Sequence, residues 1–232
     1  SNLQVTTLIS QRLEPTLLLA ASTIILTVLV AIPLGTLAAY KAGSWIDKFV
    51  MVFSVAGFSI PVFVLGYILV YFFAMELRWL PVQGYKSPFE YGILPFLKHI
   101  TMPAVTLSVI YIALISRMTR ASVVEVLNED YVRTARAKGQ SEFKILLRHA
   151  LRNAAVPIVT VLGISVALMI GGVVVTESVY NVPGLGRLVL DAVLARDYGV
   201  IQGLILFFSF IYIFINLLID LSYTFIDPRI RY

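Results

Sequence analysis

Long stretches with almost no charged residue constrain the fold of this chain more than any other feature. Each is close to the roughly 20 residues that an α-helix needs to cross a ~30 Å hydrocarbon core. The runs are continuously apolar, whereas strands of a membrane β-barrel alternate apolar and polar residues. We therefore expect an all-α, polytopic membrane helical bundle with five spans, at about residues 16–40, 49–74, 101–120, 154–175 and 200–222.

The overall composition agrees with a membrane protein. Of the 232 residues, 59% are hydrophobic and 13% are charged, with a mean hydropathy of +0.90. Soluble domains carry roughly a quarter charged residues. The absence of cysteine excludes disulfides and thiolate metal sites. Basic loops on one side of a membrane explain the net charge of +5 better than nucleic-acid binding does.

The distribution of Lys and Arg predicts the orientation of the spans. Twelve of these residues fall on the face formed by loops 41–48 and 116–153 and the C-terminal tail, and six fall on the opposite face. The positive-inside rule then places the C-terminus, with Arg229 and Arg231, in the cytoplasm and residue 1 outside. Because the first residues do not resemble a signal peptide, we hypothesise that a sixth span precedes residue 1.

The sequence lacks the patterns of a self-sufficient pump or enzyme. The phosphate-binding pattern G-x-x-x-x-G-K-[ST] does not occur, and the glycine cluster at 183–187 is expected to form a turn outside the membrane. His99 and His149 fall on opposite predicted faces, so they cannot share a metal ion. We see no paired nucleophile and base. We therefore expect no catalytic residue and no metal site, and uphill transport would need energy from another protein.

A few residues within or beside the predicted spans are candidates for a pathway or a gate. Glu177 falls at the outer end of the fourth span, where it is either capped by neighbouring groups or lines an external mouth. Asp220 falls near the inner end of the fifth and either reaches the interface or braces helix packing. Pro61 can bend the second span. Gly163 and Gly171 permit close helix packing and are further pathway candidates.

The longest cytoplasmic segment, 116–153, carries eight basic and four acidic residues. Asp130 suits a helix start, where a carboxylate opposes the helix dipole. Tyr131, Ala135 and Gly139 are spaced four apart and would share one face of a short helix. Such a small-residue face could fit a groove on another protein. The pattern alone is equally consistent with a solvated loop whose positive charges only enforce topology.

A resemblance adds to this pattern. The stretch DYVRTARAKGQSEFKILLRHALRNAAVPIVTVLG resembles the cytoplasmic signature of inner-membrane permease subunits of binding-protein-dependent ABC importers, in the dipeptide, oligopeptide and nickel branch. The stretches IPLGTLAAYKAGSWIDK, SIPVFVLG, PGLGRLVLDAVLARDYGVIQG and DPRIRY match as well. The resemblance covers nearly the whole chain. It implies a single type I ABC importer transmembrane domain over residues 1–232.

The resemblance also implies how such a chain would work. Segment 121–153 would contain a coupling helix that inserts into a cleft of a separate ATPase subunit. Arg133, Thr134 and Ala135 occupy the Glu-Ala-Ala places of the general signature and Gly139 its Gly place, so a salt bridge from that glutamate is in doubt. The implied docking residues are Asp130, Tyr131, Arg133, Thr134, Ala135, Ala137 and Gly139.

The implied partners are a second homologous permease subunit, two cytoplasmic ATPase subunits that bind ATP and Mg, and an extracytoplasmic solute-binding protein. This chain would then be no enzyme and would bind no cofactor. It would lie in the bacterial inner membrane and import peptides. Nickel, glutathione or another small solute is the alternative within this class. A channel or an ion-coupled secondary transporter is the alternative from another class, and a membrane enzyme lacks a reactive constellation.

Overall fold

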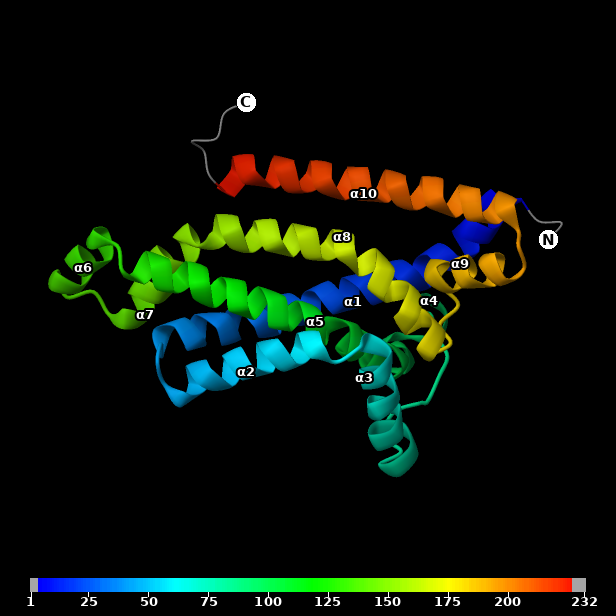
Figure 1. Cartoon of the computed structure of the whole chain (residues 1–232), viewed down its shortest axis with the longest axis horizontal. Helices are drawn as coiled ribbons and strands as arrows, with labels where there is room; N and C mark the ends of the chain where they lie inside the picture. Colours follow the sequence, from blue (N-terminus) through cyan, green and yellow to red (C-terminus); the bar gives the residue numbers. More distant parts are fainter. Residues whose placement is uncertain (1–3, 227–232) are drawn as a thin grey trace. The chain divides into compact units, whose positions relative to one another are not determined.

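The computed structural model describes the backbone of residues 4–226 and the side chains of residues 4–221. Every regular element in this range is a helix, as the apolar runs predict (Figure 1). In chain order the elements are α1 (Val5–Tyr40), α2 (Trp45–Ser59), α3 (Val62–Leu69), η1 (Val70–Glu76), α4 (Pro88–Tyr91), α5 (Ile93–Leu127), α6 (Asp130–Ala137), α7 (Glu142–Lys144), η2 (Ile145–Leu151), α8 (Ala155–Val179), α9 (Leu185–Leu194) and α10 (Tyr198–Ile226).

Four helices of the described range are long and apolar enough to cross a membrane: α1, α5, α8 and, within α10, Tyr198–Leu221. Helices satisfy their own backbone hydrogen bonds, which is what an apolar bilayer demands of a spanning segment. α5 begins at Ile93, well before the predicted third span, so Pro103 lies inside this helix. The predicted all-α membrane fold is confirmed. The proposed upstream span and the tail with Arg229 and Arg231 lie outside the described residues.

The second predicted span, 49–74, is not one straight helix. α2 ends at Ser59, α3 begins at Val62, and the chain bends by 103° between them. Pro61 has extended backbone angles, with φ −59° and ψ 137°. A proline disfavours helical geometry in the residue before it, which ends α2 at this point. Hydropathy predicted a continuous span because Ile60 and Pro61 leave the run apolar.

The chain folds as two compact units that are described separately. Unit 1 comprises Ser1–Leu26, Ile60–Val109 and Val166–Phe214. One of its apolar clusters joins η1 and α5 to the residues that follow α8: Val70, Ala74, Met102, Val179, Tyr180 and Val182. Another joins α9 and α10 to the first turns of α1 through Leu185, Leu188, Ala192, Val200, Leu204, Leu8 and Leu13.

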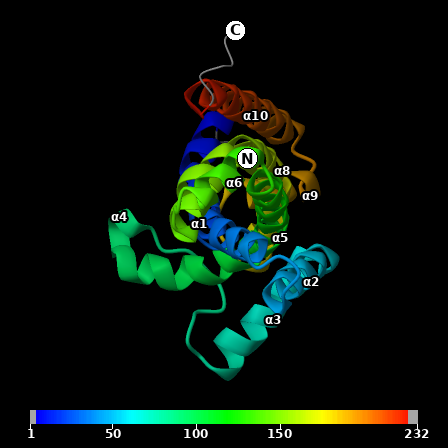
Figure 2. The same ribbon diagram turned by 90° about the vertical axis from the view of Figure 1, so that its left-hand side faces the viewer.

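Unit 2 comprises Thr27–Ser59, Ile110–Ser165 and Ile215–Tyr232. It contains the end of α1 and the predicted cytoplasmic segment 116–153. Figure 2 shows the chain from the side of α6. One apolar cluster joins α1 and α5 to η2 and α8 through Ala39, Val123, Ala150, Ala154 and Ile158. The same unit therefore holds the candidate docking helix and the helix ends to which it is attached.

Candidate functional site

α6 is a short polar helix with its charges arranged along the dipole. Asp130 lies in its first turn and Arg136 in its last, where each charge opposes the partial charge of the helix end. Arg133 Nη1 lies 3.3 Å from Asp130 Oδ1, and the two side chains are 71% and 94% exposed. Exposed pairs of this kind contribute about 0–1 kcal/mol. Both side chains thus remain available to a partner.

The buried face of α6 includes one residue of the predicted docking set, and docking itself stays a prediction. Val132 is fully buried and Ala135 is 8% exposed, and both pack with Ile145 beside Val126 and Leu127. Ala135 therefore holds α6 against its own chain. A spacing of four residues identifies a shared face, but it cannot show that η2 folds back to cover it. The residues of α6 that are exposed, among those predicted to dock, are Asp130, Tyr131, Arg133, Thr134 and Ala137.

Gly139 terminates α6 and does not extend its face. Its φ is +77°, a left-handed conformation that glycine adopts without strain. The Gly139 N–H donates to the Arg136 carbonyl at 2.9 Å, and the Gln140 N–H donates to the Ala135 carbonyl at 3.2 Å. These two bonds form the Schellman motif, a common end of α-helices. No other described residue lies within 4 Å of a Cβ added at Gly139, so the requirement for glycine is one of backbone conformation.

Polar side chains tie α6 to the helices that follow. Two of the links start from opposite ends of α6, at Tyr131 and Arg136, and the third starts from the turn that follows it. The three links are Arg136 Nε and Nη2 to the Glu142 carboxylate (2.9 and 3.2 Å), Asn153 Nδ2 to Tyr131 Oη (2.6 Å) and His149 Nε2 with Gln140 Oε1 (2.8 Å). Tyr131, predicted to share a face with Ala135 and Gly139, thus uses its hydroxyl in a contact within the chain and remains 42% exposed.

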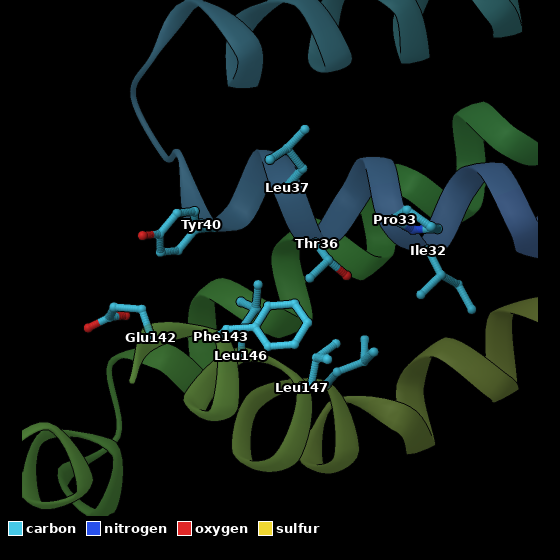
Figure 3. Close-up of a pocket in the computed structure, with 10 residues that line it drawn as sticks. Ile32, Pro33, Thr36, Leu37, Tyr40, Glu142, Phe143, Leu146 and Leu147 are labelled. Atoms are coloured by element: carbon cyan, nitrogen blue, oxygen red, sulfur yellow. The ribbon is translucent and has the colours of Figure 1, made fainter. Parts of the chain in front are cut away.

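An apolar cavity of about 440 Å³ lies between the end of α1 and the α7–η2 segment. In Figure 3, Phe143, Leu146 and Leu147 lie opposite α1, and Thr36 points toward them. The Thr36 side chain is buried, and its hydroxyl has no hydrogen-bond partner among the described residues. The cavity shows that one side of the α7–η2 segment is apolar.

An ion pair that the sequence reasoning missed holds the α1–α2 loop to α5. Asp47 is 5% exposed and accepts from Arg120 Nη2 at 2.7 Å and from Arg120 Nε. The Gly43 N–H also donates to Asp47 Oδ2 at 2.8 Å. From sequence, Arg120 is only one of the charges that set orientation. The one signal in the sequence for this ion pair was Asp47, a single acid in a predicted basic loop. Its partner could not be identified, because Arg120 lies 73 residues further along the chain.

Glu177 is buried at the end of α8. Neighbouring groups cap its carboxylate, which is one of the two arrangements expected from the sequence. Its carboxylate accepts from the Thr16 hydroxyl at 2.6 Å and from the Arg187 N–H at 3.0 Å. The Leu185 N–H donates to Thr16 Oγ1 at 2.8 Å. A Cβ at Gly184 would overlap the Glu177 carboxylate, so the glycine-rich turn before α9 fits closely around this group. In this conformation Glu177 lies inside unit 1, and its role in a pathway stays a prediction.

A second polar link in unit 1 joins α1 to the segment after η1. The Tyr85 hydroxyl donates to Glu14 Oε1 at 2.8 Å. Burial and this hydrogen bond raise the pKa of Tyr85 above its ordinary value of 10.0, so the phenol is neutral at physiological pH. The segment around Tyr85, which follows the second span, is therefore held against α1.

The remaining pathway candidates have different local surroundings. Gly163 packs closely against α10, because a Cβ there would lie 2.7 Å from Ile219 Cγ1. No other described residue lies within 4 Å of a Cβ at Gly171, so packing within the described chain does not explain this glycine. Pro61 is at the bend before α3. Among the described residues, no group of three or more His, Cys, Asp or Glu could hold a metal ion.

These features identify the class of protein. It is a polytopic helical membrane protein in which a short polar helix packs at the end of a long apolar helix. The family follows from sequence. Residues 31–232 match the model of the binding-protein-dependent transport system inner membrane component, and the chain belongs to this family of inner-membrane permease subunits. The resemblance noted in the sequence is thereby confirmed.

Similar proteins carry the same assignment. A probable peptide ABC transporter permease protein of Sinorhizobium fredii is 59% identical over 225 residues, which is 97% of this chain and 72% of the relative. The glutathione transport system permease protein GsiC of Escherichia coli is 44% identical over 224 residues, 97% of this chain and 70% of the relative.

Solved structures show the fold. A chain of the MetNI methionine ABC transporter in an inward-facing form gives a TM-score of 0.75 at 16% identity, covering 96% of this chain and 97% of that one. An amino acid ABC transporter with histidines gives a TM-score of 0.62 at 17% identity, with 97% and 95% covered. The expected fold, a type I ABC importer transmembrane domain, is confirmed.

Proposed function

We propose that this chain is the transmembrane subunit of an ATP-driven importer that carries peptides across the bacterial inner membrane. The observation that carries the proposal is α6: a polar helix with an exposed face, whose buried face packs beside the end of α5, in a chain of the permease family. The relatives support the solute class, because one is named for peptides and the other for glutathione, which is itself a tripeptide.

The chain works with partners that supply energy and solute. A second homologous permease subunit completes the pathway, and an extracytoplasmic binding protein delivers the solute. ATP and Mg bind to two separate cytoplasmic ATPase subunits, so this chain is not an enzyme and binds no cofactor. The lack of a phosphate-binding loop in the sequence supports this division of labour. The C-terminus lies in the cytoplasm, on the side of α6.

The contacts of α6 explain how movement of an ATPase would reach the spans. The exposed residues Arg133, Thr134 and Ala137 provide the docking surface. Val132 and Ala135 connect the opposite face to the end of α5 and the start of η2. Close-packed interiors transmit displacement because they compress little. A push on α6 therefore moves the cytoplasmic ends of α5 and α8 together within unit 2.

Cysteine cross-linking tests the docking surface directly, because the chain has no native cysteine. In the assembled complex, Thr134→Cys and Ala137→Cys are expected to cross-link to the ATPase subunit. Ala135→Cys is the matched control: it lies on the same helix, is 8% exposed and should react little. Cross-links from Thr134 to the binding protein, or equal yields from positions 134 and 135, would contradict the proposal.

A further inference from the structure

A second cavity, of about 600 Å³, opens where α6 ends, and its walls are basic. It is lined by Gly139, Gln140, Ser141, Lys144, Arg148 and His149. Neither Lys144 nor Arg148 forms an ion pair with a described residue, and the acid nearest to them in sequence, Glu142, is bound to Arg136. Two positive side chains thus face one space without a neutralising partner.

The π-helical geometry of η2 gathers these groups. In a π-helix each N–H bonds to the carbonyl five residues earlier, so residues four and five apart lie side by side. Lys144, Arg148 and His149 have this spacing. In an α-helix of 3.6 residues per turn, His149 would be rotated about 140° away from Lys144. Lys144 and Arg148, four residues apart, would share a face in an α-helix too, and the π-helical geometry adds His149 to that face.

The same geometry gives the α7–η2 segment a second, apolar face. Phe143, Leu147 and Leu151 are also four residues apart, and they line the cavity against α1. The two cavities have no lining residue in common. The basic cavity instead begins at the turn Gly139–Ser141, directly after the end of α6 at Ala137. An occupant of the basic cavity is thus placed beside a partner of α6 and not in the apolar space near α1.

We propose that the basic cavity of Lys144, Arg148 and His149 binds a carboxylate side chain of the ATPase subunit that docks on α6. This inference rests on the proposed function. Lysine and arginine offer several N–H donors, and their hydrogen bonds to a carboxylate are charge-assisted. Arg133 on α6 is paired with Asp130, whereas Lys144 and Arg148 line the cavity without an ion pair to a described residue. The cavity therefore favours an acidic partner.

The cavity would select among ATPase subunits as well as bind one. A partner with a lysine or arginine at the matching position would bring like charges together and lose affinity. Complementary charges at the edge of an interface also raise the association rate, and salt screens this effect. Binding that depends on the basic cavity should therefore weaken as the salt concentration rises.

The test measures ATPase binding to the assembled permease pair in phosphatidylcholine nanodiscs, at 50 and 300 mM NaCl. The double variant Lys144→Gln/Arg148→Gln should bind roughly tenfold more weakly at 50 mM, from two lost charge-assisted contacts of about threefold each. The difference should shrink at 300 mM. Lys86→Gln/Lys98→Gln, on the opposite predicted face, is the control and should keep the original Kd. An unchanged Kd for the double variant at both salt concentrations would overturn the proposal.

Further arms of the experiment distinguish a protein carboxylate from a lipid headgroup, and failure of the cavity from failure of docking. If the loss occurs only in phosphatidylglycerol nanodiscs, the cavity binds a lipid headgroup and the proposal fails. The single variant Arg148→Gln gives the answer if the double variant does not fold, with an expected loss of about threefold. If Thr134→Cys still cross-links to the ATPase while the variants bind normally, the cavity is wrong and docking through α6 stands. If position 134 never cross-links, docking itself is wrong.

Discussion

At the scale of single residues, two aspartate–arginine pairs of unit 2 have very different surroundings. Asp47 is buried, and its partner Arg120 has a side chain that is 26% exposed. Asp130 and Arg133 are mostly exposed on α6. Removing one member of a buried pair leaves a charge with no partner in a poorly solvated place, whereas water replaces an exposed partner easily. The first pair therefore supports the fold, and the second is available for docking.

Neutralising each aspartate tests this difference. Asp47→Asn should lower the free energy of unfolding by roughly 2–4 kcal/mol, because Arg120 loses its charged partner in a largely buried setting. Asp130→Asn is the matched control and should change it by less than about 0.5 kcal/mol. Denaturant unfolding of the purified chain in detergent measures both. Equal effects of the two substitutions would show that the Asp47 pair does not support the α1–α2 loop.

At the scale of elements, the long apolar helices and the short helix at Asp130 could be predicted, but α4, α9, the two π-helices and the buried faces could not. Hydropathy located the apolar runs, because length and composition decide whether a segment can cross a bilayer. A bend at Pro61 was expected from the sequence, but its size of 103°, which divides the second span into two helices, was not, because the run stays apolar on both sides of the proline. The buried face of α6 was missed because Ala135 packs on Ile145, which belongs to a different element. Glycine at position 139 was predicted to allow close approach of a partner. The structure gives it another role, because it ends α6 in a Schellman motif.

Two substitutions at Gly139 separate backbone conformation from docking. Gly139→Val should destabilise the end of α6 by about 1–2 kcal/mol, because a β-branched residue is strained at positive φ. Coupled transport should fall with it, since the turn also positions Gln140 and the basic cavity. Gly139→Asn should keep most of the activity, because asparagine tolerates this conformation. Uptake and ATP hydrolysis by the reconstituted complex are the measurements. Identical behaviour of the two variants would rule out the conformational explanation.

At the scale of the whole molecule, the family and the absence of a phosphate-binding loop lead to one central claim, that an external ATPase drives solute movement through this chain. The residues that would dock to the ATPase could be named from the resemblance, but their contacts within this chain could not. Their contacts depend on pairings such as Tyr131 with Asn153, 22 residues apart, which no local pattern contains. If an ion gradient drove transport, the exposed face of α6 and its contacts with the following helices would have no function.

Uptake of a labelled peptide into proteoliposomes tests this claim most directly. The vesicles contain this chain, its second permease subunit and the ATPase subunits. The binding protein is added on the side that corresponds to the extracytoplasmic face. Peptide should accumulate only when ATP and the binding protein are both present, and ionophores that collapse proton and sodium gradients should not reduce it. Accumulation that proceeds without the ATPase subunits and disappears when an ion gradient is collapsed would contradict the claim.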